Sequence, residues 1–274
     1  MLSKLLKYEL IATGRIMLPL YVLLIVASAA LGTNMSLSGD GPQGVFTVIL
    51  LILFTVSVAA VFIATFTLML VRFYRNLLGD EGYLMFSLPT STGRHIASKV
   101  ICPLIWICCS LGVGLLCGFI MERLLGIGGD QFYEQVKLIW NMLMGRYGSA
   151  GSIRILILLV VTGILSILES IVEVYAAMSV GHLWSNHRII GSVLAYIGFS
   201  ACETIITQVF HLEKVLEKIQ ASAVVSNSAG MEVNITWLNS IVPNSLWIMG
   251  IALVELIIYG TITWYVLDRR LNLV

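Results

Sequence analysis

Six long apolar stretches follow one another along the chain, separated by polar segments. They cover residues 16–31, 45–71, 101–121, 155–184, 189–212 and 246–267. Each is close to or beyond the roughly 20 residues that a helix needs to cross a bilayer core. The runs are continuous rather than alternating, which favours helices over the strands of a membrane barrel. The pattern therefore predicts an all-α membrane protein with six transmembrane helices, forming a single transmembrane domain over residues 1–274.

Composition supports this assignment. The chain is 58% hydrophobic and 11% charged, whereas soluble domains carry about 25% charged residues. We expect a lipid bilayer around nearly all of the protein, and no nucleic-acid partner. The first apolar stretch is longer than a signal-peptide core and precedes no clear cleavage site, so we interpret it as a retained helix. The five cysteines lie inside apolar stretches without metal-ligand spacing, which predicts small packing residues, with no disulfide and no metal.

The distribution of Lys and Arg predicts the orientation in the membrane. With the N-terminus inside, ten basic residues lie in inner segments and six in outer ones. The inner residues are Lys4, Lys7, Arg15, Arg72, Arg75, Arg94, Lys99, Arg188, Arg269 and Arg270. The outer residues are Arg123, Lys137, Arg146, Arg154, Lys214 and Lys218. Both termini are therefore predicted to be cytoplasmic.

The segment before the first apolar stretch has a helical pattern of its own. Leu2, Leu5, Leu6 and Leu10 recur at helical spacing, with lysines on the other side. This spacing predicts a short interfacial helix over residues 1–14, lying in the inner headgroup region. Glu9 falls within the apolar arc of that helix and weakens the pattern. The alternative is that the first span begins early and extends into the cytoplasm.

The loops differ in length and pattern. Two long loops, 122–154 and 213–245, are predicted to be extracellular and to carry short helices at the outer membrane surface. In the first of them, Asp130 is a suitable N-cap for a helix with apolar residues on one face. The connection over 185–188 is so short that the fourth and fifth spans must form a tight hairpin. The loop over 72–99 is predicted to be cytoplasmic and has apolar positions of its own.

The cytoplasmic loop holds a distinctive string. Residues 79–91 read Gly-Asp-Glu-Gly-Tyr-Leu-Met-Phe-Ser-Leu-Pro-Thr-Ser. Gly79 with Asp80 and Glu81 can open a short helix, whose N-terminal dipole favours acidic residues, and Pro89 ends it. The apolar side chains of this stretch suit a groove on another protein. The chain contains no G-x-x-x-x-G-K-[ST] phosphate loop, so any ATP-driven work requires a partner chain.

This string resembles the cytoplasmic segment after the second helix in permease subunits of bacterial ABC transporters of the type 2 exporter family. The start of the chain, residues 1–10, is similar to the N-terminal interfacial helix of those subunits. The resemblance implies a coupling helix within residues 79–88, docked on a separate ATPase subunit. The docking residues would be Asp80, Glu81, Tyr83, Leu84, Met85, Phe86 and Leu88. The structural alternative is a loop that packs only on this chain.

The resemblance has further implications. It implies an ATP-driven exporter in the bacterial cell membrane, with two permeases and two ATPases working together by alternating access. ATP and Mg would bind the ATPase partner, so this chain would hold no cofactor and would not itself be an enzyme. The second permease would be a copy of this chain or a different one. Peptide, lipid, glycan and drug cargoes all remain open.

Polar residues within the last three spans form a second constellation. Thr162, Ser166, Glu169 and Glu173 share one face of the fourth span, and Tyr196, Ser200, Glu203 and Thr207 share one face of the fifth. The sixth span adds Glu255 and Tyr259. Carboxylates at membrane depth are costly unless they are paired, protonated or facing water. We therefore take Glu169, Glu173, Glu203, Glu255, Tyr196 and Tyr259 as candidates for a substrate pathway, with a hint of cationic cargo. Hydrogen bonding between helices is the alternative.

Two other function classes compete with the exporter. A proton-coupled secondary transporter would use Glu169, Glu173 and Glu203 as proton relays, although no internal repeat is visible in the sequence. An intramembrane hydrolase would need a nucleophile or acid pair in a recognisable motif, and we find none. Copurification of an ATP-binding subunit would separate the exporter from both.

Overall fold

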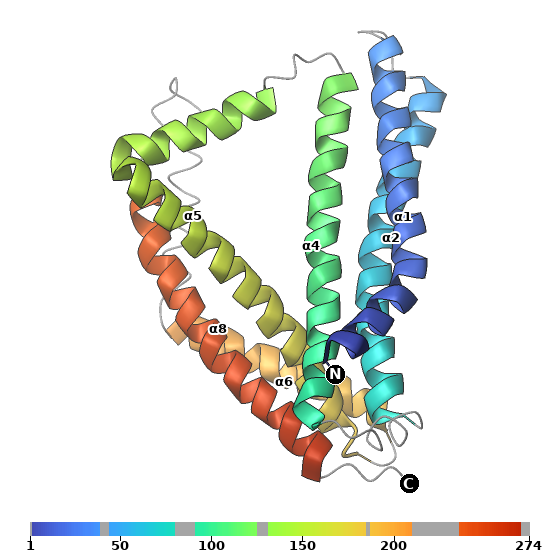
Figure 1. The fold of residues 1–274 in the computed structure, drawn as a ribbon, viewed down its shortest axis with the longest axis vertical. Coiled ribbons are helices and arrows are strands. Elements are labelled where there is room, and N and C mark those ends of the chain that lie inside the picture. The colour runs from blue at the N-terminus through green and yellow to red at the C-terminus, as the bar shows by residue number, and fades with distance from the viewer. Residues whose placement is uncertain are drawn as a thin grey trace. The chain divides into compact units, whose positions relative to one another are not determined.

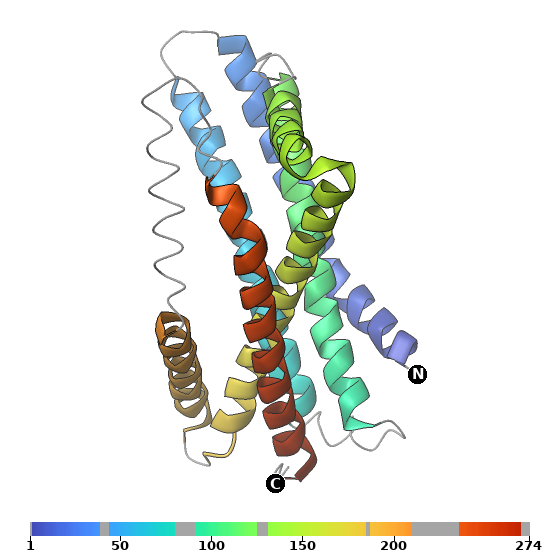
Figure 2. The same ribbon diagram turned by 90° about the vertical axis from the view of Figure 1, so that its left-hand side faces the viewer.

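The structure is a computed structural model and describes residues 2–38, 44–79, 91–124, 131–184, 187–209 and 236–269. Its elements in chain order are α1 (Leu2–Ser38), α2 (Val45–Phe73), the π-helix η1 (Tyr74–Leu78), α4 (Thr92–Leu124), α5 (Gln131–Gly181), α6 (Arg188–Val209) and α8 (Thr236–Arg269). Every element in these ranges is a helix, as Figures 1 and 2 show. This confirms the prediction of an all-helical protein.

Within the described residues, six helical segments are long and apolar enough to cross a membrane. They are Ser3–Leu37, Val45–Leu78, Thr92–Leu124, Tyr147–Gly181, Arg188–Ile206 and Ser245–Arg269. Each contains or largely overlaps one of the six apolar stretches of the sequence. The chain is therefore a multi-pass membrane protein by the length and composition of its helices.

The helices form two compact units, and each is described by itself. The N-terminal unit is Met1–Gly148 and the C-terminal unit is Ser149–Val274. The boundary falls inside α5, where Gly148 has φ 67° and ψ 176°. A positive φ of this size is strained for residues with a Cβ and readily adopted by glycine. Gly148 therefore allows the helical chain to change direction between the two parts of α5.

In the N-terminal unit, α1 packs against both α2 and α4. Its core contains Met17, Tyr21 and Leu24 from α1, Val61 from α2 and Cys117 from α4. The helix α1 is unbroken from residue 2 onward, although its first turns lean away from the rest in Figure 1. A proline inside α1, at position 19, removes one intrahelical hydrogen bond. The placement of residues 1–14 in the headgroup region stays a prediction.

In the C-terminal unit, α6 begins a few residues after α5 ends, and the two helices come close together at Gly181 and Ser192. A Cβ placed on Gly181 would lie 2.1 Å from the backbone nitrogen of Ser192. Only glycine leaves room for the two helices to approach so closely. Further along, α6 contacts α8 through Phe199 and Tyr259, whose ring centroids are 5.1 Å apart.

Helices extend further into the predicted loops than the apolar stretches do. Of the predicted cytoplasmic loop 72–99, residues 72–78 continue α2 and η1, and α4 begins at Thr92. Of the loop 122–154, residues 131–148 are helical, whereas Asp130, the predicted N-cap, lies outside the described residues. In the loop 213–245, residues 236–245 belong to α8 itself rather than to a separate helix. Extending an existing helix costs little once it has nucleated, which explains the longer elements.

Hydroxyl side chains in both units return hydrogen bonds to their own helices. In α2, Thr55 and Ser57 donate to the carbonyl oxygens of the residues four positions earlier, at 2.8 and 2.7 Å. In the C-terminal unit, Thr162, Ser179 and Thr263 do the same, each at 2.8 Å. A hydroxyl satisfied in this way can lie at membrane depth at little cost.

Candidate functional site

The predicted docking residues lie outside the described part of the chain. They are Asp80, Glu81, Tyr83, Leu84, Met85, Phe86 and Leu88. Their flanks are described: Leu77 and Leu78 are buried at the end of η1, and Arg94 donates a backbone hydrogen bond to Ser91 at the start of α4. The segment is thus bounded by ordered helices on both sides, and its docking role stays a prediction.

All six candidates for the substrate pathway lie in the C-terminal unit, within described helices. Glu169 and Glu173 on α5 are 7% and 5% exposed, and Glu255 on α8 is 6% exposed. Glu203 on α6 is half-buried. Because these three side chains are more than nine-tenths buried, they face protein rather than open solvent. We call the four residues the carboxylate cluster.

The helix register places three of the four carboxylates at one level. From the close contact between Gly181 and Ser192, Glu169 lies twelve residues back along α5 and Glu203 lies eleven residues on along α6. At 1.5 Å per residue, both lie about 17 Å from the hairpin contact. Glu169 and Glu203 therefore lie at about the same height above the hairpin contact, and both belong to helical segments that are long and apolar enough to cross a membrane.

The contact between α6 and α8 brings Glu255 to the same level. From the Phe199–Tyr259 ring contact, Glu203 lies four residues on and Glu255 lies four residues back. Because α6 and α8 run in opposite directions, both steps lead the same way from the ring contact. Glu203 therefore lies level with both Glu169 and Glu255.

Electrostatic contacts agree with this register. The negative charge of Glu203 interacts electrostatically with Glu169, Glu173 and Glu255. For each of these three residues, Glu203 is the neighbouring charge with the strongest electrostatic effect. Among the described residues, the groups acting on Glu169 are the other three carboxylates and the Ser170 hydroxyl. The sequence left open a cationic partner for Glu169 and Glu173, and the described residues supply none to these two side chains.

Three carboxylate oxygens of the cluster have no hydrogen bond within the structure. The Oε1 atoms of Glu169, Glu173 and Glu255 are inaccessible and form none with the described residues. On insertion scales, an acidic residue near the centre of a membrane helix costs about 3 kcal/mol, so four charged residues at that depth would cost about 12 kcal/mol. Protonation, water or an external cation must offset most of that cost.

Two tyrosines and one phenylalanine lie near the carboxylate cluster. Tyr259 is 6% exposed, and its hydroxyl group is close enough to all four carboxylates to interact with their charges electrostatically. Tyr196 is more exposed and is acted on by Glu173, Glu203 and Glu169. The ring of Phe199 packs against Tyr259 one helical turn from Glu203. The structure thus brings together the acids and tyrosines that the sequence singled out.

A second buried charged group lies in the N-terminal unit and was not singled out from the sequence. Glu9 accepts hydrogen bonds from Arg72 Nη1 at 2.8 Å, from Asn76 Nδ2 at 3.3 Å and from Lys99 Nζ. Glu9 is 8% exposed and Lys99 is 3% exposed. We call these four residues the Glu9 cluster. The sequence carried a signal for it, because Glu9 lies on the apolar arc of its helix.

The Glu9 cluster continues into a polar seam between α1 and α4. Thr13 donates to the Glu9 carbonyl oxygen at 2.8 Å and accepts from Trp106 Nε1 at 2.7 Å. Tyr21 OH lies 2.7 Å from Ser110 Oγ and donates to the carbonyl oxygen of Trp106 at 3.1 Å. The bonds of Thr13 and Tyr21 with residues of α4 cross from one helix to the other, so they fix the register of α1 against α4.

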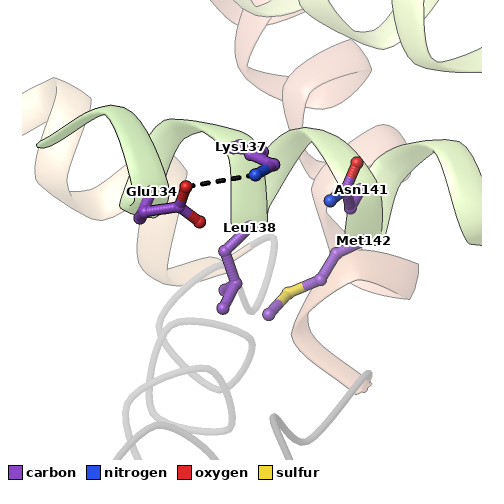
Figure 3. A pocket seen from close by; sticks show the side chains of 5 residues that line it. All are labelled: Glu134, Lys137, Leu138, Asn141 and Met142. Carbon is purple, nitrogen blue, oxygen red and sulfur yellow. Dashed lines mark hydrogen bonds and ion pairs between the residues drawn. The ribbon is translucent and has the colours of Figure 1, made fainter. Parts of the chain in front are cut away.

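A shallow hollow lies on the first part of α5. Its volume is about 420 Å³, and Glu134, Lys137, Leu138, Asn141 and Met142 line it (Figure 3). Lys137 Nζ donates to Glu134 Oε1 at 3.1 Å, and this bond together with the carboxylate charge raises the pKa of Lys137. Both side chains are exposed. An open hollow on one helix face lacks the enclosed, convergent polar groups of a ligand site.

Comparison with known proteins gives no match to this chain. No family model, no curated protein and no solved structure matches it.

Proposed function

We propose that this chain is the transmembrane permease subunit of an ATP-driven exporter, coupled to a separate ATPase and paired with a second permease. The observation that carries the proposal is the string 79–91 between two membrane-spanning helices, with its resemblance to the coupling segment of type 2 ABC exporters. The site of the working unit is the bacterial cell membrane, with both termini in the cytoplasm.

The Glu9 cluster supports a coupling role for this segment. Arg72 lies seven residues before Gly79, and Lys99 lies eight residues after Ser91. Both bind the same carboxylate on α1. A push on the segment from a closing ATPase dimer would therefore reach α1, α2 and α4 together rather than bending one helix alone.

The test is replacement of the apolar docking residues. The double substitution Leu84→Asp with Phe86→Asp should leave the permease inserted and folded but abolish copurification of the ATPase. Apolar anchors in a protein groove typically contribute 2 kcal/mol or more each, and two buried charges add a desolvation cost. The measurement is the amount of ATP-hydrolysing subunit retained per permease after affinity purification.

The control is Leu183→Asp, which changes an exposed leucine in the connection between α5 and α6. It introduces the same change outside the proposed docking segment and should retain the ATPase. Retention of the ATPase by the double variant would refute the docking role. Loss in both variants would show that any added charge on this side disrupts the complex.

The carboxylate cluster favours one competing function, a proton-coupled secondary transporter. Its buried oxygens accept no hydrogen bond from the described residues, which fits carboxyl groups that gain and lose protons. The two functions differ in their energy source. Transport by the purified chain in vesicles, driven by a pH gradient without any ATPase, would establish the second function and exclude the first.

A further inference from the structure

The carboxylate cluster combines an unbalanced negative charge with aromatic faces. Glu169, Glu203 and Glu255 come from three different helices to one level within the C-terminal unit, as the helix register indicates. Glu169, Glu173 and Glu255 are more than nine-tenths buried, and each has an inaccessible oxygen without a hydrogen bond among the described residues. These oxygens can accept hydrogen bonds only from a group that the described chain does not supply.

A tyrosine provides an independent observation at the same place. Tyr259 is 94% buried by the same measure, and its ring packs against Phe199 one turn from Glu203 and Glu255. Its hydroxyl forms no hydrogen bond with the described residues, although all four carboxylates act on it. Aromatic faces beside carboxylates are the surroundings in which proteins recognise organic ammonium and other bulky cations.

We propose that the carboxylate cluster, with the rings of Phe199 and Tyr259, is a binding site for a bulky organic cation. The carboxylates compensate the positive charge, and the rings contact the apolar body of the ligand. The site would make organic cations the substrate class of the proposed exporter, and to that extent the inference rests on the proposed function. Binding itself requires neither ATP nor an ATPase.

Two alternatives explain the same side chains. Shared protons would neutralise the acids and leave no site for a cation. Bonds between helices would use the carboxylates as structural acceptors, and these would not discriminate between ligands of opposite charge. A ligand pair of matched shape and opposite charge separates these alternatives from the proposal.

The experiment uses the full chain in lipid nanodiscs, with tetraphenylphosphonium as the cationic probe. Tetraphenylborate has nearly the same size and shape and the opposite charge. We expect saturable binding of the cation, measured with radiolabelled probe, and no competition by the anion. The substitution Glu203→Gln should weaken cation binding at least about tenfold, because it removes the central charge. Glu134→Gln, on the exposed part of α5, should leave binding unchanged.

A second measurement does not depend on the folding of any variant. Dicyclohexylcarbodiimide modifies carboxyl groups in apolar surroundings, and mass spectrometry locates the adducts. In the native chain, tetraphenylphosphonium should protect Glu169, Glu173 and Glu255 from modification, and tetraphenylborate should not. Equal protection by both ions, absence of protection, or unchanged binding in Glu203→Gln would overturn the proposal.

The outcome is separable from that of the docking test. If the chain binds the cation but never retains an ATPase, the cation site stands and the exporter is refuted. If it retains the ATPase but shows no charge-selective binding, the exporter stands and this site is refuted.

Discussion

The sharpest stability prediction concerns the Glu9 cluster, where one carboxylate serves two cations of unequal burial. The Lys99 side chain is 2% exposed, whereas that of Arg72 is 28% exposed. We propose to remove each charge singly, with Glu9→Gln, Lys99→Met and Arg72→Met, and then in the two pairs that include Glu9. The two double-mutant cycles isolate the coupling of Glu9 to each cation.

The burial of each partner sets the expected magnitudes. Removing one member of a buried ion pair typically costs about 3–5 kcal/mol, because the remaining charge is left desolvated. Glu9→Gln removes the buried carboxylate that Lys99 binds and should lower the free energy of unfolding by about 3 kcal/mol. Arg72 can turn to solvent, so its coupling to Glu9 should stay below about 1 kcal/mol. The Glu9–Lys99 coupling should therefore be at least about twice the Glu9–Arg72 coupling.

The assay is reversible unfolding in mixed micelles of increasing dodecyl sulfate content, followed by helical circular dichroism. Membrane insertion is confirmed for every variant before comparison. Equal coupling energies for the two cations, or a Glu9→Gln variant as stable as the native chain, would refute the reasoning. Either result would mean that Lys99 reaches water or another acceptor when Glu9 is neutral.

Two further predictions address the hairpin and the topology. Gly181→Ala should destabilise the chain by about 1–3 kcal/mol, since its Cβ would overlap the Ser192 backbone, whereas Gly163→Ala has open space and should be neutral or mildly stabilising in the same unfolding assay. In a variant without the native cysteines, a cysteine at Ser38 should react with an impermeant thiol reagent applied to sealed cells, and one at Ser91 should not; the reverse labelling would invert the predicted orientation.

The membrane spans could be predicted from the sequence because their signal is local. Each apolar stretch is long enough to be recognised alone, and each lies within a helix of the structure or largely overlaps one. The ends were harder to predict, because helices continue beyond the apolar residues when a buried polar contact stabilises the extension. The start of α1 shows this clearly, since Glu9 interrupts the apolar pattern and is nevertheless buried.

The carboxylate cluster and the Glu9 cluster differ in how much of each could be predicted from the sequence. Helical spacing groups Glu169 with Glu173 on one face of α5, and both side chains are buried in the structure. The Glu9 cluster joins residues 63 and 90 positions apart in the sequence. No periodicity connects such distant positions, and the sequence alone identifies Arg72 and Lys99 only as loop charges that set the orientation.

The hydroxyl side chains that donate hydrogen bonds to their own helix have a mechanical consequence. A side chain such as Thr162 or Thr263, whose hydroxyl donates to its own helix, uses that hydrogen there rather than in a bond to a neighbouring helix. Along such a surface, side-chain packing sets the position of the neighbouring helix without these hydrogen bonds. In the polar seam between α1 and α4, by contrast, hydrogen bonds of Thr13 and Tyr21 with α4 fix the position of one helix along the other. If α1 slides along α4, several hydrogen bonds between the two helices must break at once. If a helix slides past Thr162, the hydrogen bond of Thr162 within α5 stays intact.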